Sequence, residues 1–214
     1  MGDLMRFIVN IIQSCDNYPM NKTLKLEKLK KEMVEDKNLP LSANLVFGEG
    51  NVDCDVLFIG EAPGALEDEL VRPFVGRSGK LLRKSILGLG WREEDVYITN
   101  IVKRRPPENR DPTPREIEAY KPYLTRQIEI INPKLIVSLG RFSMNYFLPE
   151  AKISQAQGKL FDVGLPSEAL AKEGNWRIVP IYHPSAALRG NTMMKAFLES
   201  FKKLPAIVKT LRRS

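Results

Sequence analysis

The stretch VLFIG at residues 56–60 decides the fold of this chain. It is apolar throughout and closes on glycine, a pattern that is typical of a strand buried on both faces of a parallel sheet. The stretches VYITNI at 96–101 and LIVSLG at 135–140 repeat this pattern. Residues 158–163 and 176–182 predict two further strands.

Helical patterns separate and surround these strands. Residues 78–89 are predicted to be a helix, and another helix begins at residues 113–116, where a threonine N-cap, a first-turn proline and a glutamate able to reach back to the cap stand together. A short helix is expected after residue 140. Amphipathic or charged helices are also predicted at 4–12, at 22–38 and around 194–201.

Strands that alternate with helices form parallel βαβ units with right-handed crossovers, so the fold class is α/β with a parallel sheet. A chain of 214 residues, 43% of them hydrophobic, can bury one large core or two small ones. Such sheets bind ligands outside the carboxyl ends of their strands. Polar groups that follow the strands, at Glu61, Asn100, Gly140 and His183, are therefore expected to converge on one edge.

Composition narrows the class of protein further. The net charge of +7 suits a nucleic-acid partner, because lysine and arginine displace condensed counterions from phosphate, although a basic surface can also only solvate the protein. No apolar run approaches the roughly 20 residues that span a bilayer. Two cysteines, Cys15 and Cys54, cannot build a disulfide framework or a four-thiolate metal site. We expect a cytoplasmic protein without membrane contact.

His183 is the only histidine in the chain. Imidazole readily donates a proton or a hydrogen bond near neutral pH, so a reaction in this protein that needs an imidazole must use His183. The alternative is a histidine that lies on the surface or is satisfied within the core. Its position at the end of the last strand favours a role in the site.

Two other residues have both a functional and a structural interpretation. Phe74 lies in a loop between proline and glycine, where its ring can stack on a flat ligand or fill the core beneath the loop. Asn100 interrupts an apolar strand, and its carboxamide offers a donor and an acceptor that match the edge of a base carrying one acceptor and one donor, such as O4 and N3–H of uracil. It can equally cap the strand end. The turn at residues 60–64 fits neither a Walker loop nor a dinucleotide fingerprint.

Basic residues follow the strands as well. The runs at 103–107 and 109–112 can hold backbone phosphates or form a solvated loop. After His183 come small residues, then Leu188 and Arg189. A leucine with small neighbours suits insertion into a base stack, and an arginine suits the adjacent phosphate.

Five strings occur in order over residues 45–190: GEAPG, EDxxxRPFVG, VYITN, IVSLG and HPSAALR. Together they resemble the family 4 uracil-DNA glycosylases. The resemblance implies a three-layer α/β/α sandwich with a short, mainly parallel central sheet. It further implies one domain over residues 1–214, with residues 1–44 as a helical extension packed on it.

The resemblance also implies roles for individual residues. It identifies His183 as the donor to uracil O2 and places Glu61 and Ala62 in the turn beside the scissile bond. Glu61 is the nearby carboxylate there, and therefore the candidate group for activating water. Five residues are expected to bind the base, and five to bind DNA. The first set is Ala62, Gly64, Glu67, Phe74 and Asn100; the second is Lys103, Arg105, Ser185, Leu188 and Arg189.

The chain departs from this family at its iron–sulfur ligands. Family members usually hold a [4Fe–4S] cluster through four cysteines, and one thiolate cannot hold such a cluster. We therefore expect no cofactor, with other side chains filling the vacated volume. The four positions read Cys15, Tyr18, Arg104 and Tyr120.

The function implied is that of a monofunctional uracil-DNA glycosylase, which flips uracil out of DNA and hydrolyses the N-glycosidic bond to leave an abasic site. The expected partner is uracil-containing DNA, double- or single-stranded, bound by a monomer. The alternative is a catalytically weak or inactive DNA-binding relative that senses lesions or recruits partners. The missing cysteines favour this alternative, whereas the intact Phe74, Asn100 and His183 oppose it.

Overall fold

A computed structural model describes residues 21–164 and 175–213. A six-stranded sheet forms its centre, in the order β1-β3-β2-β4-β6-β5. The helix expected at 4–12 lies outside the described residues. The strands are β1 (Glu49–Gly50), β2 (Val56–Gly60), β3 (Val96–Asn100), β4 (Leu135–Leu139), β5 (Phe161–Gly164) and β6 (Asn175–Ile181).

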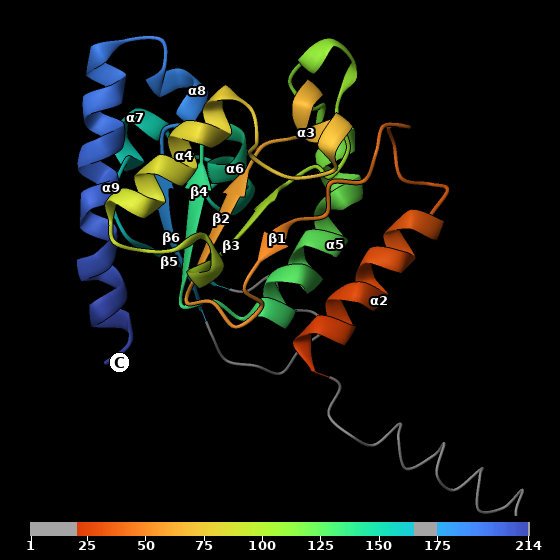
Figure 1. Ribbon diagram of the computed structural model, residues 1–214, viewed down its shortest axis with the longest axis horizontal. Helices are drawn as coiled ribbons and strands as arrows, with labels where there is room; N and C mark the ends of the chain where they lie inside the picture. Colours follow the sequence, from red (N-terminus) through yellow and green to blue (C-terminus); the bar gives the residue numbers. More distant parts are fainter. Residues whose placement is uncertain (1–20, 165–174, 214) are drawn as a thin grey trace, which may run out of the picture.

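The helices cover both faces of the sheet (Figure 1). The helices predicted at 22–38, at 78–89, from 113 onward and around 194–201 are all present, and the last of them extends beyond the predicted stretch to Leu211. They are α2 (Lys22–Glu35), α3 (Ala65–Leu70), α4 (Arg77–Gly88), α5 (Pro114–Ile131), α6 (Arg141–Phe147), α7 (Ile153–Ala156), α8 (Pro184–Ala187) and α9 (Asn191–Leu211). None of the helices in the described ranges is long and apolar enough to cross a membrane.

The four inner strands, β3, β2, β4 and β6, are parallel, and the short strands β1 and β5 pair antiparallel at the two edges. This confirms the α/β class and the mainly parallel sheet. Strand β5 begins three residues later than expected. Its residues alternate between half-buried and exposed, because an edge strand is covered less completely than an inner one.

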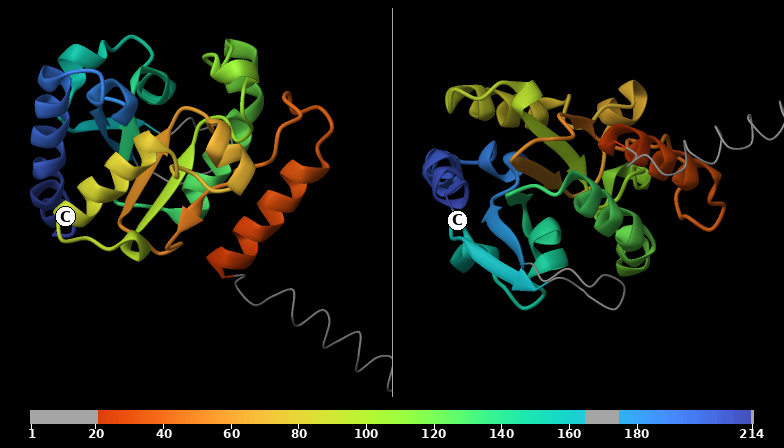
Figure 2. Two further views of the ribbon diagram at one scale, coloured as in Figure 1. Left: turned by 45° about the horizontal axis from the view of Figure 1, so that its top comes forward. Right: turned by 90° about the horizontal axis from the view of Figure 1, so that it is seen from below.

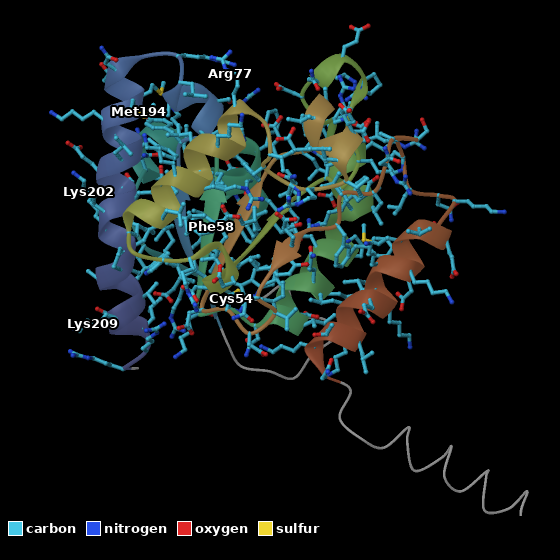
Figure 3. All side chains as sticks on the ribbon, in the orientation of Figure 1. Cys54, Phe58, Arg77, Met194, Lys202 and Lys209 are labelled. Carbon is cyan, nitrogen blue, oxygen red and sulfur yellow. The ribbon has the colours of Figure 1, made fainter. Side chains whose placement is uncertain are left out.

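Alternate side chains of each inner strand enter opposite cores. Val56 and Phe58 face helices α4 and α9, whereas Leu57 and Ile59 face α2 and α5. Figure 2 shows the sheet between these two helical layers, and Figure 3 places Phe58 inside the molecule. The three-layer sandwich is therefore the direct result of strands that are apolar on both faces.

Helix α5 begins as its sequence predicts. The Thr113 hydroxyl accepts a hydrogen bond from Glu116 N, and the Glu116 carboxylate accepts one from Thr113 N, which completes a capping box. Helix α2 packs beside α5 through buried Leu29 and Met33. The Tyr123 hydroxyl donates to Asp36 just beyond the end of α2, at 2.7 Å.

Candidate active site

A pocket of about 650 Å³ opens at the carboxyl ends of the parallel strands. Glu61, Asn100, Gly140 and His183, which follow or end four different strands, all line it, as the strand-end rule predicted. The pocket size is typical of a small-molecule site. Its wall also includes Ala62, Pro63, Gly64, Glu67, Phe74, Ser78, Pro106, Asn109, Arg110, Asp111, Arg141, Phe142, Ile153, Tyr182, Ser185, Ala186, Arg189 and Met193.

Asn100 presents an unused acceptor to this pocket. Its side chain is 2% exposed, and its Oδ1 atom is buried without a hydrogen-bond partner in the protein. Gly60 is the register partner of Asn100 on the neighbouring strand β2. Because a buried carbonyl oxygen without a partner costs about 1–3 kcal/mol, Asn100 Oδ1 is suited to accept from a ligand.

Phe74 satisfies both interpretations of its sequence position. Its side chain is only 5% exposed and packs in the core cluster that contains Phe58 and Leu82, yet it also lines the pocket. Its backbone is left-handed, with a φ of 54°, which is uncommon for an aromatic residue.

Two charged side chains hold the backbone on either side of Phe74 through hydrogen bonds. The Glu67 carboxylate accepts hydrogen bonds from Val75 N at 3.1 Å and Gly76 N at 2.9 Å. The Arg83 guanidinium donates to the Phe74 carbonyl at 2.9 Å and to the Pro73 carbonyl at 2.9 Å. Glu67 thus supports the Phe74 loop from the pocket side. The sequence did not single out Arg83, whose position inside a helix gave no signal of this contact.

His183 is held as a neutral imidazole. Its Nδ1 atom accepts from Ser185 N at 3.2 Å and lies 2.7 Å from the Ser185 hydroxyl. Since Nδ1 accepts a backbone hydrogen bond, the ring hydrogen is on Nε2. Burial lowers the pKa of His183 to about 4, and the charge of Arg189 acts in the same direction, against that of Glu67. The ring lies 5.9 Å from that of Phe74, tilted by 40°.

Glu61 lies in the same pocket with a weakened acidity. Burial, together with the negative charge of Asp111, raises the pKa of Glu61 to about 7, against the opposing effect of the positive charge of Arg141. Asp111 and Arg141 form an ion pair at 2.6 Å. Arg141 was not among the predicted site residues. Its position directly after Gly140, at a strand end, was the signal that could have identified it.

The residues predicted to contact DNA have different environments. The prediction for Lys103 is wrong: its side chain is 0% exposed, because Thr99, Asn100 and Gln127 surround its amine. Arg105 is half-buried and donates to Asn109. The remaining three lie around α8 beside the pocket, where Leu188 is 40% exposed, Arg189 is exposed and Ser185 lines the wall.

Family 4 uracil-DNA glycosylases, which this sequence resembles, hold cluster ligands at four positions. The side chains that the structure describes at two of these positions do not fit an iron–sulfur cluster. Tyr120 is fully buried and donates to the Pro40 carbonyl at 2.8 Å, and Arg104 donates to the Ala43 carbonyl. A phenol and a guanidinium stand where two thiolates are needed. Cys15 and Tyr18 lie outside the described residues. Within the described part of the chain, no group of three or more His, Cys, Asp or Glu residues could hold a metal ion.

The fold and the pocket define an α/β sandwich protein that presents an aromatic ring, an unused carboxamide oxygen and a neutral imidazole at the carboxyl edge of its sheet. The chain belongs to the uracil DNA glycosylase superfamily, whose family model matches residues 47–207.

Similar proteins extend over most of the chain. It is 43% identical over 199 residues to the type-4 uracil-DNA glycosylase of Sulfurisphaera tokodaii, covering 88% of this chain and 87% of the relative. It is 44% identical over 168 residues to that of Thermotoga maritima, covering 78% and 84%. It is 39% identical over 202 residues to that of Archaeoglobus fulgidus, covering 92% and 89%.

Proposed function

We propose that this chain is a monofunctional uracil-DNA glycosylase that binds a flipped uracil in the pocket and hydrolyses its N-glycosidic bond. The observation that carries the proposal is the meeting of Asn100 and His183 in one pocket. Asn100 offers a buried acceptor without a partner, and His183 offers a neutral N–H donor. Uracil carries the complementary groups, with a donor at N3 and an acceptor at O2.

The residues divide the reaction between them. Phe74 stacks on the base and Asn100 accepts from N3–H, which offsets the few kcal/mol needed to take a base out of the helix. As the N1–C1′ bond breaks, its electron pair passes to the base and spreads onto O2. The His183 Nε2–H donates to O2, where charge develops only in the transition state, and one such donor typically accounts for about 3–4 kcal/mol.

Water completes the reaction by adding its oxygen to C1′ and losing a proton. Glu61 is the carboxylate of the pocket that we assign to receive this proton, directly or through solvent. A raised pKa suits a general base near neutral pH. The described residues that line the pocket include no lysine. They therefore offer no side-chain amine that could form a Schiff base with the sugar and cut the strand.

DNA contact is assigned to the rim of the pocket. Leu188 enters the base stack, and Arg189, Arg105 and Ser185 bind the neighbouring phosphates. Ala62 and Gly64 let the turn after β2 approach the sugar closely, while Glu67 stays beside C5 of the base. The protein acts as a monomer and as a single domain that includes the N-terminal extension.

The protein is further proposed to work without an iron–sulfur cluster, since Arg104 and Tyr120 occupy ligand positions with side chains that bind backbone carbonyls instead. Iron and acid-labile sulfide should therefore be far below stoichiometric amounts in protein purified without oxygen. Four iron atoms per chain would contradict this proposal and leave the glycosylase assignment standing.

The decisive experiment is cleavage of a uracil-containing oligonucleotide. Incubation followed by alkali should cut the strand at uracil, in duplex or single-stranded substrate, while the matching thymine oligonucleotide stays intact. A cut that appears without alkali contradicts the monofunctional assignment. No cut on either substrate contradicts the enzyme assignment.

A further inference from the structure

Lys103 is a buried lysine behind the wall of the pocket. Its amine donates to the Thr99 hydroxyl at 2.5 Å, to the backbone carbonyl of Asn100 at 2.8 Å and to the Gln127 side-chain carbonyl at 2.6 Å. No carboxylate in the described residues forms an ion pair with it. A lysine is almost never fully buried without a pairing charge, so this one requires an explanation.

The hydrogen bond to Asn100 does not depend on the charge of the amine. As an ammonium, Lys103 donates to all three neighbours. Burial lowers its pKa well below the usual range, and a neutral amine keeps two N–H donors, which are enough for the carbonyl oxygens of Asn100 and Gln127. The carbonyl of Asn100 keeps its donor in both states.

This contact lies at the end of strand β3. The strand ends at Asn100, and the chain that follows stays beside β2, because Ile101 N donates to the Gly60 carbonyl at 2.9 Å and Val102 N to the Glu61 carbonyl at 3.0 Å. The partners of the amine are themselves anchored, because Thr99 and Gln127 both donate to the Phe47 carbonyl, at 2.8 and 3.1 Å. Lys103 thereby connects the last residue of β3 to helix α5.

We propose that Lys103 is a positioning residue for base recognition: by holding the backbone carbonyl of Asn100, it sets the orientation of the Asn100 carboxamide in the pocket. This inference rests on the proposed function, since it assigns Asn100 to the pyrimidine edge. Lys103 itself does not touch the base. It acts through Asn100, and its loss should therefore weaken recognition of uracil and leave contacts with the DNA backbone unchanged.

The test compares Lys103→Met with wild type and with Lys202→Met, a matched change at an exposed lysine of α9 that projects into solvent (Figure 3). Lys103→Met should lower the single-turnover rate on uracil-DNA by about 10-fold or more and weaken inhibition by free uracil to a similar extent. Affinity for DNA carrying a tetrahydrofuran abasic analogue should stay within about twofold of wild type. Lys202→Met should match wild type in the rate and in uracil inhibition.

A double-mutant comparison separates positioning from general destabilisation. In an Asn100→Ala background, Lys103→Met should cause no further loss of rate, because the group through which it acts is gone. An equal loss in both backgrounds, or a parallel loss of abasic-DNA affinity, overturns the inference. If Lys103→Met does not fold, Gln127→Leu removes one partner of the amine and should reproduce the selective loss. Failure of the proposed function is distinct, since wild-type protein would then not cleave.

Discussion

The ring of Phe74 occupies the space that a Cβ atom on Gly60 would fill. The same added atom would overlap Asn100 Oδ1, so one missing side chain makes room for both the stacking ring and the unused acceptor. Gly60 ends strand β2, and its backbone is the surface against which these two groups are placed.

This contact predicts a large effect for Gly60→Ala. The methyl group should displace Phe74 and Asn100 together and lower the single-turnover rate on uracil-DNA by about 100-fold, because a displacement of about 1 Å at a reacting group costs that much. Gly88→Ala, at the end of α4, is a suitable control, since a Cβ atom there meets nothing within 4 Å. Equal activity of the two variants would contradict the arrangement.

His183→Ala should lower the single-turnover rate by about 100-fold or more, since it removes the donor to O2. His183→Gln, which retains an N–H donor, should recover part of this loss. Because the pKa of His183 is lowered to about 4, the ring stays neutral from pH 5 to 8, and its titration should leave no inflection in the pH–rate profile over that range. An inflection near pH 6.5 that disappears in His183→Gln would contradict the neutral assignment.

Glu61 should set the pH dependence of the reaction. A general base whose pKa is raised to about 7 predicts a rate that increases up to about pH 7 and then levels off. Asp111→Asn removes a neighbouring negative charge and should move this midpoint to lower pH, whereas Arg141→Met removes a positive charge and should move it to higher pH. A midpoint that both variants leave unchanged would exclude Glu61 as its origin.

Stability provides an independent measure of the same carboxyl. A folded-state pKa above the unfolded value of 4.5 means that the folded protein binds the proton more tightly. The resulting stabilisation is complete below pH 4.5 and is lost as the pH rises to about 7. Glu61→Gln should therefore become more stable relative to wild type over this window, by about 1–3 kcal/mol at pH 8. Urea unfolding between pH 4 and pH 8 measures this, and a constant difference would contradict it.

The inner strands could be predicted because their apolar runs are local signals of burial on both faces, and the strand-end rule then brought Glu61, Asn100 and His183 together. Edge strands are less visible. β1 has only two residues, and β5 is half-exposed, so neither has a continuous apolar pattern.

The burial of Lys103 could not be predicted from the basic run in which it lies. A lysine in a run of basic residues is normally solvated, and its burial depends on Gln127, a residue 24 positions away that only the folded chain brings beside it. The support of Phe74 by Arg83 is equally non-local, because it joins a loop carbonyl to the interior of helix α4.

The bonds that Arg104 and Tyr120 make with the carbonyls of Ala43 and Pro40 join the segment after α2 to the body of the protein. A guanidinium and a phenol are covalent parts of the chain, so chelators cannot remove them. Their hydrogen bonds contain no iron that peroxide could release. This attachment should accordingly survive aeration, EDTA and growth without iron, conditions that dismantle a thiolate-bound cluster. In a repair protein, that would preserve the attachment of the segment after α2 during the oxidative stress that also damages DNA.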